Sequence, residues 1–134
     1  MEPGGLVYVC DDTEQIRRLI RVNLELEGYD VREVSDGGQL LEELHSGVDV
    51  PGVITIDAQM SPRDGWWTIS QIRADPRLAD IPVIMVTASV QQHDRVQAQW
   101  SGLDAFVSKP FDPDHLIGLV HGFMAEGRAH QPAP

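Results

Sequence analysis

Short apolar runs alternate along this chain with longer segments whose apolar residues recur at helical spacing. The apolar runs cover residues 6–10, 31–34, 53–56, 83–86 and 105–107. The helix-like segments cover residues 14–27, 36–45, 66–74, 91–101 and 113–124. Strands that alternate with helices predict a parallel sheet with helices on both faces, because parallel strands need crossover connections. We therefore predict an α/β fold built from five strand–helix units.

Glycine and proline mark the boundaries of several predicted helices. Gly28 and Gly47 follow the last apolar positions of the first two helices, as expected of residues that stop a helix. Pro113 lies in the first turn of the last helix, where its missing N–H has no partner to lose. These boundaries support the helix assignments made from periodicity.

The length of 134 residues suits one domain with one core. We place the folded domain at residues 6–125, an N-terminal tail at residues 1–5 and a C-terminal tail at residues 126–134. The C-terminal tail is predicted to be disordered. No internal repeat, low-complexity block or linker to a second domain stands out.

Composition and charge argue against several classes of protein. Ten basic and 21 acidic residues give a formal net charge of −11, which disfavours direct binding to nucleic acid. No apolar stretch approaches the roughly 20 residues of a membrane span, and the N-terminus does not resemble a secretory signal. The single cysteine, Cys10, fits a reducing compartment and is predicted to be a small buried side chain. We therefore expect a cytoplasmic protein that contacts neither nucleic acid nor membrane.

Charged side chains follow three of the predicted strands. Asp11 and Asp12 come after the first strand, Asp57 after the third and Lys109 after the fifth. The carboxyl ends of parallel strands meet at one edge of the sheet, where open α/β folds place their ligand crevice. Three carboxylates and one ammonium at that edge predict a site for magnesium and a phosphoryl group.

Each of these residues also has an ordinary structural interpretation. Asp12 could cap the first helix, with Gln15 completing a capping box. Asp57 could be a turn residue, Thr87 a strand former and Lys109 a solvated surface side chain. These interpretations together require a coincidence at four strand ends, so the site is favoured. The five histidines, His45, His93, His115, His121 and His130, lack the spacing of metal ligands.

Taken together, the motifs resemble the receiver domain of two-component response regulators over about residues 6–125. The matching motifs, each after a different strand, are Asp11-Asp12, Asp57 with Gly65, Thr87-Ala88 and Lys109-Pro110. The resemblance implies a flavodoxin-like, doubly wound sheet of five parallel strands in the order 2-1-3-4-5.

The resemblance also implies a role for each site residue. Asp57 would be the phosphoacceptor. Mg²⁺ or Mn²⁺ would be held by the carboxylates of Asp12 and Asp57 and the backbone carbonyl of Gln59, with Asp11 acting through water. Lys109 would pair first with Asp57 and then with the phosphoryl oxygens, and it would precede a cis peptide bond at Pro110.

Two further residues would carry the signal away from the site. Thr87 would donate its hydroxyl to a phosphoryl oxygen, and Ala88 would leave room for the donor and for attacking water. Phe106, in a strand next to that of Thr87, could then rotate inward. This movement would alter the surface made by residues 91–101, 105–107 and 113–124.

The sequence departs from the family pattern at two positions and is unusual in its tryptophans. Ser61 intervenes between Met60 and Pro62, and the switch aromatic is Phe106 rather than the commoner tyrosine. We expect one tryptophan of the Trp66-Trp67 pair to pack inward and the other to be partly exposed.

The resemblance implies a phosphoacceptor in a two-component or phosphorelay system. Its donor would be a sensor histidine kinase or a histidine phosphotransfer protein. The only reactions expected of the domain itself are phosphotransfer to Asp57 and autodephosphorylation. Its output would be phosphorylation-dependent binding to an unknown downstream protein, or homodimerisation.

Three other functions are compatible with an α/β sheet that carries an aspartate at a strand end. A haloacid-dehalogenase-type phosphatase would have an acid two residues after its aspartyl nucleophile, where this chain has Gln59. A docking module that is never phosphorylated would be favoured by loss of one of the main site residues, and none of them is lost. A nucleotide-binding fold lacks support, because no glycine-rich loop follows the first strand.

Overall fold

The computed structural model describes residues 5–47, 49–88 and 102–132, and within them one five-stranded parallel sheet has the order β2-β1-β3-β4-β5. The strands are β1 (Leu6–Cys10), β2 (Asp30–Val34), β3 (Val53–Ile56), β4 (Val83–Thr87) and β5 (Ala105–Ser108). This order confirms the predicted fold class. The predicted helix at residues 91–101 lies outside the described residues.

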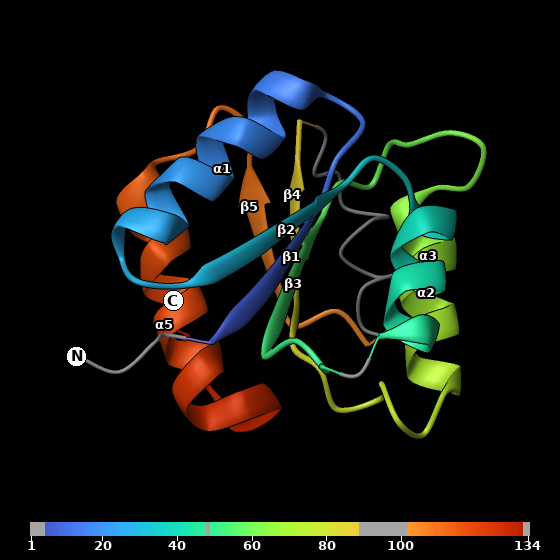
Figure 1. The fold of residues 1–134 in the computed structure, drawn as a ribbon. Helices are drawn as coiled ribbons and strands as arrows, with labels where there is room; N and C mark the ends of the chain where they lie inside the picture. Colours follow the sequence, from blue (N-terminus) through green and yellow to red (C-terminus); the bar gives the residue numbers. More distant parts are fainter. Residues whose placement is uncertain (1–4, 48, 89–101, 133–134) are drawn as a thin grey trace.

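Helices cover both faces of the sheet. The helices α1 (Glu14–Leu26) and α5 (Pro113–Glu126) lie on one side, and α2 (Gly37–Ser46) and α3 (Gly65–Ala74) lie on the other (Figure 1). Each helix turns apolar side chains toward the sheet, as Ile20 and Leu24 of α1 do. This three-layer arrangement leaves the carboxyl ends of the strands as a common edge.

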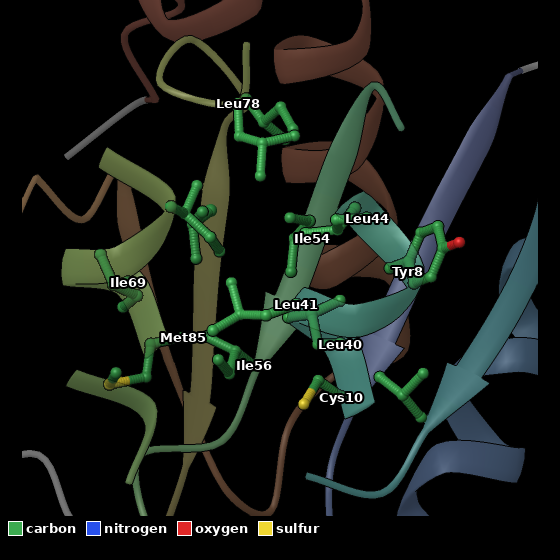
Figure 2. Close-up of a cluster of buried hydrophobic side chains, with 14 of the residues drawn as sticks. Tyr8, Cys10, Leu40, Leu41, Leu44, Ile54, Ile56, Ile69, Leu78 and Met85 are labelled. Atoms are coloured by element: carbon green, nitrogen blue, oxygen red, sulfur yellow. The ribbon is translucent and has the colours of Figure 1, made fainter. Parts of the chain in front are cut away.

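The core is divided in two by the sheet, because successive strand residues point to opposite faces. Tyr8 and Cys10 of β1 join Ile54 and Ile56 of β3 in the cluster beneath α2 and α3 (Figure 2). The alternate residues, such as Val7 of β1, belong to the cluster beneath α1 and α5. The central strands are therefore buried on both faces, which explains why their sequences are continuously apolar.

Aspartates cap three of the helices. Asp36, Asp64 and Asp112 accept hydrogen bonds from the first turns of α2, α3 and α5 at 2.8 to 3.0 Å. At α1 the N-cap is Thr13, whose hydroxyl donates to Asp12 at 3.4 Å. The interpretation of Asp12 as a helix cap paired with Gln15 is therefore wrong, which leaves its carboxylate for the edge of the sheet.

The described part of the C-terminal segment includes helical residues beyond the predicted end of the last helix. Helix α5 continues to Glu126, and a short 3₁₀ helix, Gly127–Ala129, turns the chain back. Arg128 binds Asp104 at 2.9 Å, and the ring of His130 packs edge-on against Phe123 at 4.9 Å between ring centroids. Within the tail predicted at residues 126–134, the side chains of Arg128 and His130 thus contact the domain.

Within the part of the chain that the structure describes, none of the helices combines the length and the apolar character needed to cross a membrane.

Candidate functional site

Asp57 lies at the carboxyl end of β3, where the backbone places its side chain in the crevice. Its N–H donates to the carbonyl of Cys10 at 3.1 Å, so the first residue past β3 is still tied to the end of β1. Its carboxylate is buried, with 6% of the residue exposed, and Oδ1 accepts the Gln59 N–H at 3.1 Å. This bond orients Oδ1 and leaves Oδ2 for a cation.

Lys109 supplies that cation from the end of β5. Its Nζ lies 2.9 Å from Oδ2 of Asp57 and 2.9 Å from Oδ2 of Asp11. Burial of the ammonium alone would lower the pKa of Lys109, but the hydrogen bonds and charges of the two aspartates outweigh burial and raise it. The peptide bond between Lys109 and Pro110 is cis, as the sequence resemblance implies.

Three carboxylates gather beside this ammonium. Asp11 is buried and Asp12 is exposed, and ligand oxygens of these two residues and of Asp57 all lie within 4.8 Å of one another. Carboxylate oxygens are the ligands that Mg²⁺ and Mn²⁺ prefer, and the exposed Asp12 leaves room for the waters that Mg²⁺ usually retains. The donor set therefore fits the predicted metal.

An open cavity of about 490 Å³ lies over the carboxylates. Its lining residues are Asp12, Thr13, Asp57, Gln59, Met60, Ser61, Ala88 and Lys109. Gln59 and Ala88, both singled out in the sequence, are thus brought to the site. Ser61, the residue inserted relative to the family pattern, also lines the cavity and precedes a second cis proline, Pro62.

The two predicted switch residues lie on neighbouring strands but are not directly opposite each other. Thr87 ends β4 fully buried and is paired in register with Ser108. Phe106 is paired with Met85, two residues earlier on β4. Because strand side chains alternate, Thr87, Met85 and Phe106 all point to the face covered by α3.

The tryptophan prediction is confirmed. Trp66 is buried, with 9% exposed, and its ring meets that of Phe106 edge-on at 5.9 Å between centroids. Trp67 is half-buried, and the guanidinium of Arg63 lies 4.8 Å from its ring centroid. Trp100 lies outside the described residues.

A family model for the response regulator receiver domain matches residues 7–121, nearly all of the folded part of the chain. The chain belongs to this family. The receiver domain shares 36% identity over 120 residues with the DNA-binding dual master transcriptional regulator RpaA of Synechocystis sp., covering 88% of this chain and 48% of that protein. It spans about half the length of the curated relatives that it matches first.

Solved structures agree on the fold. The Francisella response regulator 1452 receiver domain superposes with a TM-score of 0.82 at 28% identity, covering 91% of this chain and 98% of that chain. The Mn(2+)-bound form of response regulator Rcp1 superposes with a TM-score of 0.75 at 18% identity, covering 97% of each chain.

Two contacts at the receiver site were not predicted from the sequence. Arg17 of α1 donates to the carbonyl of Asp11 at 2.7 Å and so fixes the backbone of the acidic pair. Gly65 lies so close to Asp57 that an added Cβ would meet the Asp57 carbonyl oxygen at 2.3 Å. The family motif includes Gly65, but the motif gives no distance between Gly65 and the backbone of Asp57.

Cys10 lies beneath the site and is inert for a physical reason. Its thiol is buried and contacts the sulfur of Met60 at 3.6 Å. Burial, followed by the nearby charges of Asp36, Asp11 and Asp57, raises the pKa of Cys10 well above its usual value. The thiol therefore stays neutral, in agreement with the prediction of a small buried side chain.

Proposed function

We propose that this receiver domain takes a phosphoryl group onto Asp57 from a phosphohistidine of a sensor histidine kinase or a histidine phosphotransfer protein. The observation that carries this proposal is the position of the Asp57 carboxylate, 2.9 Å from the ammonium of Lys109 and grouped with two further carboxylates. A nucleophile, a fixed cation and a set of hard oxygen ligands thus share one cavity.

The proposed step is a substitution at phosphorus. One carboxylate oxygen of Asp57 forms a bond to phosphorus while the P–N bond of the donor breaks. The imidazole leaves with the electron pair of that bond and takes up a proton, and the product is an aspartyl phosphate. Lys109 moves from the carboxylate to the phosphoryl oxygens, and Thr87 donates its hydroxyl to another of them.

The metal belongs to the same proposal. Asp12, Asp57 and the carbonyl of Gln59 would hold Mg²⁺ or Mn²⁺ directly, and Asp11 would hold it through water. The cluster within 4.8 Å supports this donor set, and a protein of the same fold, Rcp1, is known in a Mn²⁺-bound form. When bound, such an ion neutralises charge on the transferring phosphoryl oxygens.

The signal would leave through Thr87 and Phe106. Movement of Thr87 toward the phosphoryl group would vacate space near the ring of Phe106, and the surface of β5 and α5 would change with it. Residues 91–101, which lie outside the described residues, complete this surface in the sequence prediction. The two positions of Thr87 and Phe106 define two states in equilibrium. Phosphorylation shifts that equilibrium only as far as the phosphoryl group interacts differently with the two states.

The output is proposed to be binding of a downstream protein or homodimerisation. The relative RpaA is named as a DNA-binding regulator and is about twice the length of this chain. The receiver itself, with a net charge of −11, is poorly suited to contact DNA. It would act as a cytoplasmic signalling module rather than as an enzyme with an external substrate.

The alternative of a phosphatase that uses an aspartyl nucleophile is disfavoured by Gln59. This residue lines the cavity two positions after Asp57, where that class of enzyme needs a general acid. A carboxamide is not a proton donor of suitable acidity, so the leaving group would not be protonated there.

Incubation with acetyl phosphate and Mg²⁺, followed by intact mass measurement, tests the proposal. The wild-type protein should gain the mass of one phosphoryl group, and Asp57→Asn should gain none. Asp80→Asn is the matched control, because Asp80 is an exposed aspartate before the amino end of β4, at the edge of the sheet opposite to Asp57. Equal labelling of Asp57→Asn and the wild-type protein would remove Asp57 from its proposed role.

A further inference from the structure

We propose that Trp66 is a positioning residue for Phe106 and links the ring of Phe106 to the backbone of Asp57 by a route that does not pass through Thr87. The inference rests on the proposed function, in which Phe106 is the residue that moves. It concerns a contact between α3 and β5 that the sequence did not predict.

The contact itself is specific in geometry. The ring centroids of Trp66 and Phe106 lie 5.9 Å apart with an interplanar angle of 66°, the edge-to-face arrangement that aromatic rings favour. Trp66 is buried, whereas Phe106 is half-buried, so the tryptophan is the more fixed partner. Phe106 has no hydroxyl, so packing alone decides where its ring lies.

The backbone of Trp66 is held by the phosphoacceptor segment. The N–H of the preceding Gly65 donates to the carbonyl of Ala58 at 2.9 Å. A Cβ at Gly65 would meet the carbonyl oxygen of Asp57 at 2.3 Å, so the first residue of α3 lies directly on the residue that receives the phosphoryl group. A backbone shift at Asp57 or Ala58 is therefore passed to the first turn of α3 and to the Trp66 ring.

Two paths then converge on Phe106. One runs along β4, where Met85 is the register partner of Phe106 and Thr87 follows at the site. The other runs from Asp57 through Gly65 and Trp66. An edge-to-face pair is strong enough to change the ratio of two ring positions by about two- to ten-fold. That range is sufficient to bias a switch whose two states are close in free energy.

Phenylalanine-labelled protein, observed by aromatic NMR with and without Mg²⁺ and beryllofluoride, tests the inference. The chain has three phenylalanines, so Phe106→Leu assigns the relevant resonances. Trp66→Leu removes the aromatic contact but keeps an apolar side chain, and Trp66→Phe keeps an aromatic edge. Trp67→Leu is the control, because Trp67 faces Arg63.

In the free protein, Trp66→Leu should change the chemical shifts of the Phe106 ring. Trp66→Phe should give Phe106 chemical shifts close to those of wild type. Trp67→Leu should leave the Phe106 chemical shifts unchanged. With beryllofluoride, Trp66→Leu should change the ratio of the two ring positions by about two- to ten-fold while still binding the ligand. Identical Phe106 resonances in Trp66→Leu and wild type, in both conditions, would overturn the inference.

A reciprocal measurement protects the test against misfolding of Trp66→Leu. Both wild-type protein and Phe106→Leu are labelled with fluorotryptophan. The Trp66 resonance should differ between the two proteins, and in wild type it should also move when beryllofluoride is added. A Trp66 resonance that does neither would also contradict the inference. If beryllofluoride binds neither the wild-type protein nor any variant, the proposed function is refuted instead. The comparison of the free proteins would still decide the role of Trp66.

Discussion

The ammonium of Lys109 lies 2.9 Å from Oδ2 of Asp57, although the two residues are 52 positions apart in the sequence. The sheet explains the contact, because β3 and β5 are parallel and both end at the same edge. The same ammonium lies 2.9 Å from Asp11, so one cation compensates two buried carboxylates. This arrangement links the stability of the receiver to its chemistry.

Replacing Lys109 with methionine should therefore destabilise the metal-free protein. The substitution leaves two buried carboxylates without their cation, and breaking a buried ion pair costs about 3–5 kcal/mol. Saturating Mg²⁺ should recover part of this loss, because a bound cation replaces the missing charge. Urea unfolding with EDTA and with Mg²⁺ measures both effects.

Arg18→Met is the matched control for that experiment. Arg18 pairs with Glu14 at 3.0 Å, but both side chains are largely exposed. Its loss should cost less than about 1 kcal/mol, with or without Mg²⁺. An equal loss in the two variants would show that the Lys109 contact contributes no more than a surface pair.

Asp12 should govern metal affinity, because it is the exposed member of the carboxylate cluster. Asp12→Ala should weaken Mg²⁺ binding by about tenfold or more, or ~1.4 kcal/mol, and should slow phosphorylation by acetyl phosphate. Quenching of tryptophan fluorescence provides the binding curve, with Trp66 or Trp67 as the nearby reporter. Full phosphorylation of the wild-type protein in EDTA would be incompatible with a metal-assisted step.

Thr87→Ala should separate phosphorylation from its structural response. The variant keeps Asp57 and Lys109, so we expect it to bind beryllofluoride. Without the hydroxyl it should lose most of the change in amide exchange that the wild-type protein shows in β5 and α5. If the exchange of residues 102–124 changes as much in Thr87→Ala as in wild type, Thr87 does not carry the signal.

The thiol of Cys10 should resist alkylation in the folded protein. Burial and nearby carboxylates raise its pKa above the ordinary value of 9.0, so little thiolate forms at pH 8–9, and the site is closed to reagent. Iodoacetamide should modify the chain slowly in buffer and rapidly in urea. Equal rates in the two solvents would mean that Cys10 is accessible.

The raised pKa of Cys10 also makes the free energy of unfolding depend on pH. The unfolded chain loses the thiol proton at lower pH than the folded chain, so ionisation favours the unfolded state. The stability that the protonated Cys10 thiol gives to the folded state is present below pH 9.0. It is lost as the pH rises above that value toward the pKa of Cys10 in the folded protein. Cys10→Ala should therefore lose less stability than the wild-type protein over that alkaline range.

Asp104 should be critical for stability at the opposite edge of the sheet. Its carboxylate accepts from Arg73 and Arg128 at 2.9 Å and from the N–H of Val83 at 2.8 Å. Burial, together with the charge of Arg128, lowers the pKa of Arg73 to about 10, so this guanidinium depends on its partner. Asp104→Ala should destabilise the domain by about 3–5 kcal/mol.

Arg128→Ala provides the comparison, because Arg128 is more exposed than Arg73. Its loss should cost about 1 kcal/mol or less and should loosen the 3₁₀ helix at the C-terminus. Urea unfolding of the two variants should rank Asp104→Ala as much the less stable. The reverse ranking would show that Arg128, which also donates to the carbonyls of Ala79 and Gly102, contributes more to stability than the carboxylate of Asp104.

The site could be predicted from the sequence because each of its residues follows an apolar strand. Asp11, Asp57, Thr87 and Lys109 each lie at or just beyond the end of a strand, so correct strands were enough to bring them together. Small differences arose at element ends. Strand β2 begins at Asp30 rather than at residue 31, because its pairing with Leu6 extends the edge strand beyond its apolar residues.

The contacts that were missed join residues for which no sequence pattern gives the distance. Asp104 meets Arg73 and Arg128 only after α3, β5 and the segment that follows α5 have packed, and each is an ordinary charged residue in the sequence. This ion-pair network also ties the segment after α5 to the domain. The pairing of Trp66 with Phe106 likewise depends on side-chain packing between α3 and the face of the sheet that it covers.

The most direct measurement is the identification of the residue that carries the phosphoryl group. Borohydride reduces an aspartyl phosphate to homoserine, so protein treated with acetyl phosphate and Mg²⁺ can be reduced, digested and sequenced by mass spectrometry. Homoserine should appear at position 57 in wild-type protein, and at no aspartate in Asp57→Asn. Homoserine at another aspartate in wild-type protein, with aspartate intact at position 57, would contradict Asp57 as the phosphoacceptor.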